Sequence, residues 1–140
     1  MGVDETMTGS LVAGIGFRRG AGADDIAALI ARGLGLLGAN AAELAAIATA
    51  ADRATEPAIR GAAARFGLSP SPVTAAALAA RDGEVVTRSP RIEHLRGVGS
   101  LAEAAALAAA GPESRLALPR IASAAATCAL AVRQTTNPVT

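Results

Sequence analysis

Residues 11–20 (LVAGIGFRRG) combine glycines and arginines in a way that suits the binding of an anion. A short apolar run ends in a glycine-rich turn, and a helical pattern follows from Asp24. In such a turn glycines let the backbone approach a ligand closely, while helix amides and arginines supply positive potential. The spacing differs from the dinucleotide motif Gly-x-Gly-x-x-Gly and lacks the Lys-Ser/Thr pair of a P-loop. The residues expected to bind the anion are Gly14, Gly16, Arg18, Arg19 and Gly20.

A second pair of glycines, Gly97 and Gly99, comes directly before a predicted helix that starts at Ser100. Ser100 and Glu103 fit the capping-box pattern, in which the serine caps the helix and the glutamate side chain returns to it. That structural role explains both polar residues without a ligand. It does not explain the glycines, which would leave the helix amides open to an anion. We therefore expect all four residues to lie at a ligand-binding site.

A third polar group, Thr49, Asp52, Arg53 and Glu56, follows the second predicted strand. Ligands of parallel α/β sheets bind beyond the carboxyl ends of the strands, so this group would lie near the arginines of the first segment. Thr49 and Arg53 are expected to bind the ligand, and Glu56 and Asp52 are the candidates for a catalytic base that activates water. The alternative is a solvated turn in which Glu56 only complements a helix dipole.

Metal and cysteine chemistry have little support in the sequence. His94 is the only histidine and Cys128 the only cysteine, so no set of ligands has the spacing of a zinc site. We expect His94 at the surface and Cys128 as a small buried side chain. The sequence predicts neither a metal nor a cofactor.

The composition narrows the class of protein. The chain has 140 residues, a hydrophobic content of 51% and a net charge of +1, with Phe17 and Phe66 as its aromatic residues. It lacks the basic field and the stacking platforms of nucleic-acid binders, and no apolar run reaches the roughly 20 residues that span a membrane. The acidic start is unlike a secretory signal, and a single cysteine suits a reducing compartment. These features predict a cytoplasmic protein that binds neither nucleic acid nor membranes.

Hydrophobic periodicity predicts the order β-α-β-α-(β)-α-β-β, an α/β fold with one layered domain, a mixed β-sheet flanked by helices and a closing antiparallel hairpin. Residues 10–134 would form this domain, between a flexible leader at 1–9 and a flexible tail at 135–140. A turn-rich break at 67–72 and a polar segment at 82–96 interrupt the periodic pattern. The expected strands are 10–16, 44–49, 115–122 and 127–133, and the expected helices are 24–38, 55–66, 74–81 and 100–110.

Several short motifs occur in the order found in one known family. They are residues 14–20, Ala48-Thr49 with Glu56, Ser89, residues 97–107 with Gly111, residues 116–120, and residues 127–131. On these motifs the chain resembles the family of CobE and the C-terminal domain of CbiG, proteins of cobalamin (vitamin B12) biosynthesis. The family commonly has lysine near Arg53 and Arg120, where arginine keeps the charge but does not readily act as a base.

The resemblance implies a role around the ring-contraction steps of corrin synthesis, with a precorrin, a tetrapyrrole rich in carboxylates, as the partner. It adds Ser89 and Arg120 to the expected binding residues, and it makes other enzymes of the pathway expected partners. Two functions follow. The first is a protein that binds or handles a precorrin intermediate. The second is a hydrolase like full-length CbiG proteins, which open the δ-lactone of cobalt-precorrin-5A and release the extruded two-carbon fragment. A third hypothesis is a purely structural domain, and the ordered glycine motifs argue against it.

Overall fold

The computed structural model describes residues 10–133, which form a five-stranded mixed β-sheet with helices on both faces. The strand order is β3-β2-β1-β5-β4, in which β1, β2 and β3 are parallel and β5 and β4 form an antiparallel hairpin beside β1. The strands are β1 (Leu11–Phe17), β2 (Leu44–Ala50), β3 (Pro70–Val73), β4 (Arg115–Ala122) and β5 (Ala126–Val132). The helices are α2 (Ala23–Leu36), α3 (Pro57–Ala64), α4 (Ala75–Ala80), α5 (Pro90–Arg96) and α6 (Leu101–Ala110), with single 3₁₀ turns at Ala41–Glu43, Ala51–Arg53 and Asp82–Glu84.

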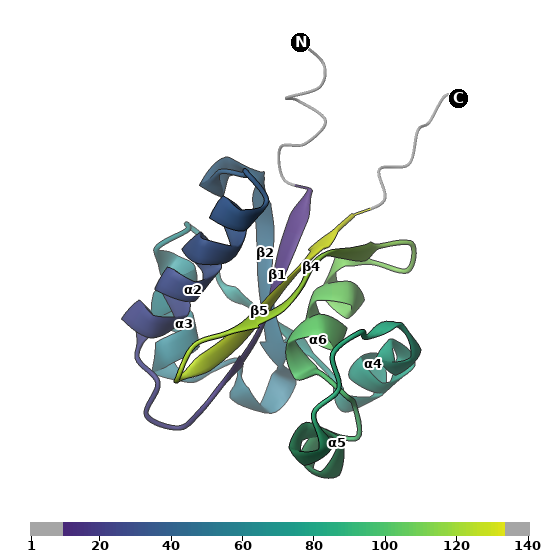
Figure 1. Cartoon of the computed structure of the whole chain (residues 1–140). Helices are drawn as coiled ribbons and strands as arrows, with labels where there is room; N and C mark the ends of the chain where they lie inside the picture. The colour runs from purple at the N-terminus through teal and green to yellow at the C-terminus, as the bar shows by residue number, and fades with distance from the viewer. Residues whose placement is uncertain (1–9, 134–140) are drawn as a thin grey trace, which may run out of the picture.

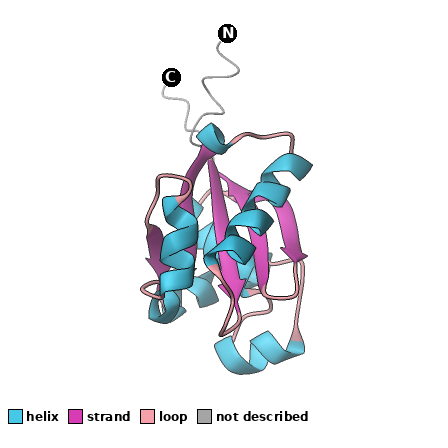
Figure 2. Cartoon of the chain, turned by 90° about the vertical axis from the view of Figure 1, so that its left-hand side faces the viewer, coloured by secondary structure: helices cyan, strands magenta, loops and turns pink. Residues whose placement is uncertain are grey.

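The molecule has three layers (Figure 1). Helices α2 and α3 cover one face of the sheet, and Figure 2 shows them in front of the strands. Helix α6 covers the other face and contacts β1, β2, β4 and β5, with α4 packed against it. A cluster of buried aliphatic residues lies on each face of the sheet. In the central strand β1, Ile15 belongs to the cluster under α2 and α3, and Val12 belongs to the cluster under α6. No helix within residues 10–133 combines the length and the apolar character needed to cross a membrane.

Helix α6 lies unusually close to the sheet because its residues and those beneath it are small. A Cβ atom built on Gly14 would overlap the carbonyl oxygen of Ala102 and lie 2.9 Å from the Cβ of Ala106. Side chains larger than hydrogen at this position would push the helix away from the strand. The abundance of alanine in α6 therefore serves close packing, since seven of its ten residues are buried.

The fold class predicted from the sequence is confirmed, and two local expectations were wrong. The segment 67–72 was expected as a break, but it contains the start of β3. Pro70 and Pro72 had indicated a turn. The strand tolerates both prolines because β3 lies at the edge of the sheet. The polar segment 82–96 contains α5, which is short and has no fully buried residue, so its periodicity is weak. The predicted leader and tail lie outside the described residues.

Candidate functional site

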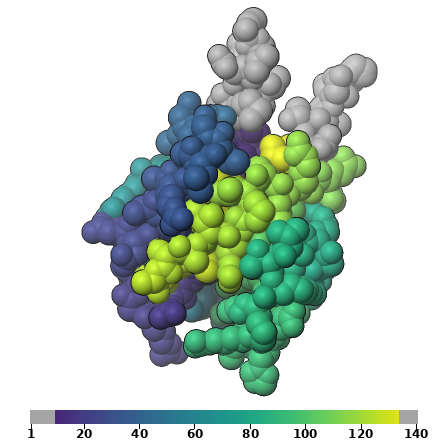
Figure 3. Space-filling view, in the orientation of Figure 1, coloured from purple at the N-terminus to yellow at the C-terminus, as the bar shows by residue number. Residues whose placement is uncertain are grey.

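The carboxyl ends of the three parallel strands meet at one edge of the sheet, together with the start of β5. Phe17 at the end of β1 pairs with Ala126 at the start of β5, and Ala50 ends β2 beside Val73 of β3. Helix α6 begins at the same edge, because Leu101 lies next to Gly16. Figure 3 shows this edge at the bottom of the molecule, where the surface is hollowed between the segment that follows β1 and the region of α5. We call it the carboxyl edge.

Two arginines at the carboxyl edge are available to an anion. Arg18 and Arg19 directly follow β1, both are exposed, and neither side chain has a hydrogen-bond or ion-pair partner among residues 10–133. The backbone amide of Arg18 donates to the carbonyl of Ala125, which ties this turn to the hairpin between β4 and β5. Arg120, near the end of β4 in that hairpin, is half-buried, and its guanidinium likewise has no partner in the described chain. These three cations form the accessible part of the site.

Arg53, which was expected to join them, already has two partners. Its guanidinium lies 4.2 Å from the centre of the Phe17 ring, and it pairs with the carboxylate of Glu56, with 3.3 Å between Nη2 and Oε1. Stacking on the ring and the ion pair together hold the guanidinium at the end of β1. The contribution of Phe17 could not be predicted from the sequence, because no local pattern pairs Phe17 with a residue 36 positions later. Arg53 and Glu56 therefore form a fixed unit beside Arg18.

Asp52 is also held by an arginine. Nη1 of Arg96, the last residue of α5, lies 2.8 Å from Oδ1 of Asp52. The hydrogen bond and charge of Arg96 hold the pKa of Asp52 below its ordinary value, although slight desolvation opposes this effect. A carboxylate with a lowered pKa is a weaker base, so this pair does not favour the catalytic role expected of Asp52. No sequence signal pointed to Arg96.

The amino end of α6, which Gly97 and Gly99 were expected to open to an anion, is capped by the protein itself. The amide of Gly99 donates to the carboxylate of Asp82 at 2.8 Å, and the Arg88 side chain lies over the same glycine. Ser100 is buried, and its hydroxyl accepts from the amide of Glu103 at 3.2 Å. Internal partners thus occupy this helix end, and the ligand-binding role of Gly99 and Ser100 stays a prediction.

The glutamate of the predicted capping box does not return to Ser100. The Glu103 side chain is fully buried, and Oε1 accepts hydrogen bonds from the amides of Val86 and Thr87 at 2.7 and 3.0 Å. Its other oxygen accepts from the amide of Arg120 at 2.8 Å. The buried Glu103 side chain thus makes its hydrogen bonds inside the protein, and the ligand-binding role expected of it stays a prediction. These bonds fix two distant segments to α6, one of which carries Arg120.

Three further residues of the predicted set are part of the packed sheet. Gly14 lies under α6, as described above, and a Cβ on Gly16 would lie 2.8 Å from Oγ1 of Thr127. Thr49 is fully buried, and its hydroxyl donates to the carbonyl of Ile15 at 2.8 Å, which ties β2 to β1. In this structure the glycines provide space for neighbouring elements and the Thr49 hydroxyl is already bonded, so the ligand-binding role of these residues stays a prediction.

The other predicted residues lie in turns and helix caps. Gly20 is exposed and has a φ of 88°, a left-handed conformation that suits glycine in the turn after β1. Gly97 has a φ of 76° and ends α5, while the Ser89 hydroxyl caps the start of α5 by accepting from the amide of Ile92 at 3.4 Å. These positions shape the segment beside the carboxyl edge.

The described residues offer no metal centre, because no three His, Cys, Asp or Glu side chains among them lie close enough to hold an ion. His94 is exposed on α5. Cys128 is buried in β5, and burial raises the pKa of its thiol to about 12, which makes it a poor nucleophile.

The fold and the carboxyl edge define the class as a small α/β protein with an arginine-lined edge at the end of three parallel strands. The chain belongs to a family of cobalamin biosynthesis proteins, described as Cobalamin synthesis G C-terminus, whose sequence profile matches residues 11–131. It is 37% identical over 121 residues to Protein CobE from Sinorhizobium sp., a match that covers 86% of this chain and 79% of that protein.

Solved structures agree with this assignment. The crystal structure of CobE, a protein from the cobalamin biosynthetic pathway, has a TM-score of 0.84 and 34% identity, and the match covers 91% of this chain and 92% of the other. The crystal structure of the cobalamin biosynthesis protein ChiG from Agrobacterium tumefaciens matches with a TM-score of 0.70 and 33% identity, and the match covers 89% of this chain and 99% of that chain. A cobalamin biosynthesis protein G homologue from Sulfolobus solfataricus shares the fold, with a TM-score of 0.66 at 23% identity, and the match covers 89% of this chain and 37% of that longer chain.

Proposed function

We propose that the protein binds a precorrin intermediate around the ring-contraction steps of cobalamin biosynthesis, and holds it at the carboxyl edge. The observation that carries this proposal is the pair Arg18 and Arg19, exposed after β1 with no acidic partner in the described chain. Precorrins carry several acetate and propionate carboxylates, and arginine binds carboxylates through paired hydrogen bonds. Membership of a family of cobalamin biosynthesis proteins supports this choice of ligand.

Arg120 lies at the same end of the sheet and extends the positive surface toward the β4–β5 hairpin. The hydrogen bond from its amide to Glu103 holds the backbone of this residue in place, so that the guanidinium starts from a defined position. Arg53 contributes less, because Glu56 already balances its charge. A ligand with two or more carboxylates would therefore bridge Arg18, Arg19 and Arg120. Transfer of the bound intermediate to other enzymes of the pathway fits this role.

The geometry favours binding over hydrolysis of a precorrin lactone. A hydrolase would need a carboxylate that can take a proton from water. Both candidates for that base are paired with arginines, Glu56 with Arg53 and Asp52 with Arg96. The Glu56 carboxylate is thus occupied by Arg53, and the hydrogen bond and charge of Arg96 hold the pKa of Asp52 below its ordinary value, which makes Asp52 a weaker base.

The test is a titration of the protein with a lactone-bearing precorrin-5-type compound, followed by its absorption spectrum. We expect a saturable spectral shift without turnover, and weaker binding by the Arg18→Ala variant. Arg115→Ala is the matched control, because Arg115 is exposed, lies opposite Val132 at the other end of the sheet, and has no side-chain partner among residues 10–133. Lactone opening that disappears in Glu56→Gln would contradict the proposal and establish the hydrolase.

A further inference from the structure

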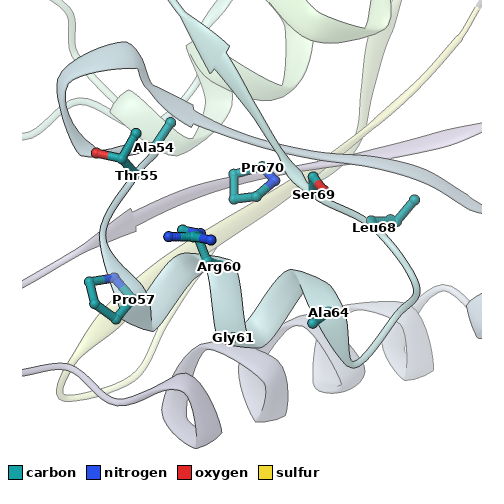
Figure 4. Close-up of a pocket in the computed structure, with 9 residues that line it drawn as sticks. All are labelled: Ala54, Thr55, Pro57, Arg60, Gly61, Ala64, Leu68, Ser69 and Pro70. Atoms are coloured by element: carbon teal, nitrogen blue, oxygen red, sulfur yellow. The ribbon is translucent and has the colours of Figure 1, made fainter.

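A groove of about 550 Å³ runs along α3 beside the edge strand β3, and none of the residues assigned above to the carboxyl edge lines it. Figure 4 shows its lining, with Arg60 between Pro57 at one end and Pro70 on the strand side. Its volume lies within the range of sites that bind small molecules in proteins, about 300–1,000 Å³. The groove adjoins the carboxyl edge only through the loop that contains Ala54 and Thr55.

Arg60 is the only charged residue that lines the groove, and its charge is not balanced within the described chain. The nearest arginines in sequence differ in this respect. Arg53 is paired with Glu56, and Arg65 is paired with Asp24 of α2. An arginine left unpaired between two paired ones provides a local excess of positive charge inside a concave surface.

The remaining lining suits a ligand with an apolar body and few polar groups. Pro57, Leu68 and Pro70 supply apolar walls, and the proline rings are rigid. The hydroxyls of Thr55 and Ser69 line the same groove and have no hydrogen-bond partner among residues 10–133. These hydroxyls and the guanidinium of Arg60 are donors that an anionic group would satisfy.

The edge strand favours a small molecule over an added peptide strand. β3 is the outermost strand on this side of the sheet, so its free edge is the place where a partner strand would pair. Two of its four residues, Pro70 and Pro72, have no backbone N–H to donate. A peptide strand added at this edge would therefore lack the hydrogen bonds that two backbone N–H groups would otherwise donate.

We propose that the α3–β3 groove binds a small carboxylic acid, with the carboxylate on Arg60 and the apolar body against Pro57, Leu68 and Pro70. The hydroxyls of Thr55 and Ser69, which lie on opposite sides of Arg60, offer further hydrogen-bond donors along the groove (Figure 4). This site is separate from the arginines of the carboxyl edge and does not depend on the function proposed for them.

The experiment is a titration of the isotope-labelled full chain with hydrocinnamate, a propionate that carries an apolar ring, followed by two-dimensional amide NMR. We expect saturable shifts at the amides of Thr55, Gly61 and Ser69 in the millimolar range. The Arg60→Met variant should bind at least about tenfold more weakly, because it loses a charge-assisted hydrogen bond. Hydrocinnamamide, which has the same ring but no charge, should bind wild type as weakly as hydrocinnamate binds that variant.

Two controls separate this site from the carboxyl edge. Arg115→Met removes an arginine at the far end of the sheet that has no side-chain partner in the described part of the chain, and this variant should bind hydrocinnamate like wild type. Arg18→Met should also leave the shifts at Thr55 and Ser69 unchanged. Equal binding by Arg60→Met, equal binding of the uncharged amide, shifts centred on Arg18, or no saturable shift would each overturn the proposal. Loss of the shifts at Thr55 and Ser69 would leave the proposed function of the carboxyl edge standing, because the precorrin titration with Arg18→Ala tests that function separately.

Discussion

The buried carboxylate of Glu103 accepts a hydrogen bond from the backbone amide of Arg120, 17 residues further along the chain, at 2.8 Å. The same side chain accepts from Val86 and Thr87, so one acidic group joins the first turn of α6 to two separate segments. A buried charge costs free energy unless hydrogen bonds compensate it, and here three amides do so. Glu103 thus fixes the backbone from which the Arg120 guanidinium extends.

We expect Glu103→Gln to lower the free energy of unfolding by about 2–3 kcal/mol. The amide oxygen of glutamine can still accept from Val86 and Thr87, but its NH₂ group would then face the amide donor of Arg120. Urea unfolding followed by circular dichroism measures the change. Glu113→Gln is the control, because Glu113 is exposed and has no partner among the described residues. Equal stability of the two variants would contradict the role given to Glu103.

The contact between Gly14 and α6 gives a second prediction. We expect Gly14→Ala to destabilise the protein by about 3 kcal/mol, because the added methyl group overlaps backbone atoms of Ala102 and neither element can move without opening the core. Gly35→Ala is the matched control, since Gly35 is an exposed position of helix α2 with open space around it. That variant should be more stable than wild type by about 0.5–1 kcal/mol. Thermal unfolding of both variants tests the pair, and a tolerated Gly14→Ala would show that α6 is less closely packed.

The features that could be predicted from the sequence are those that depend on residues close together in the chain. The alternating and helical patterns placed β1, β2, α2 and α6 within a few residues, and the turn after β1 put Arg18 and Arg19 at the carboxyl edge. The Ser100 cap was also predicted, because the serine and its amide partner are three residues apart. These features depend on local backbone preferences and on the burial of one face.

Partners that are distant in sequence could not be predicted in this way. Gly99 was expected to face a ligand, but it binds Asp82, which is 17 positions away. Asp52 was a candidate base, but it pairs with Arg96 across 44 positions. The pattern of glycines and carboxylates is the same whether a ligand or another segment of the chain satisfies them, and only the tertiary arrangement distinguishes the two.

The other end of α6 depends on Arg81, whose guanidinium is buried and donates to the carbonyls of Leu107 and Gly111, both at 2.8 Å, and to Ser114. These carbonyls would otherwise be unsatisfied at the helix end. We expect Arg81→Met to cost about 2 kcal/mol in urea unfolding, since it leaves buried acceptors without donors. Arg91→Met, at an exposed arginine without a partner in residues 10–133, should change stability little. A similar loss in both variants would refute the capping role.

The ion pair between Asp52 and Arg96 predicts a specific dependence of stability on pH. The pKa of Asp52 is lowered from its ordinary 3.8 by Arg96, so the folded protein favours the ionised carboxylate more than the unfolded chain does. The resulting stabilisation is fully present above the ordinary value and is lost as pH falls through the lower, folded value. Because Asp52 is largely exposed, we expect the pair to contribute at most about 1 kcal/mol at neutral pH. Unfolding free energies of wild type and Asp52→Asn should therefore differ at pH 7 and converge on acidification, and the same convergence should follow addition of molar salt. A difference that persists unchanged in acid would show that Asp52 stabilises the protein by something other than its charge.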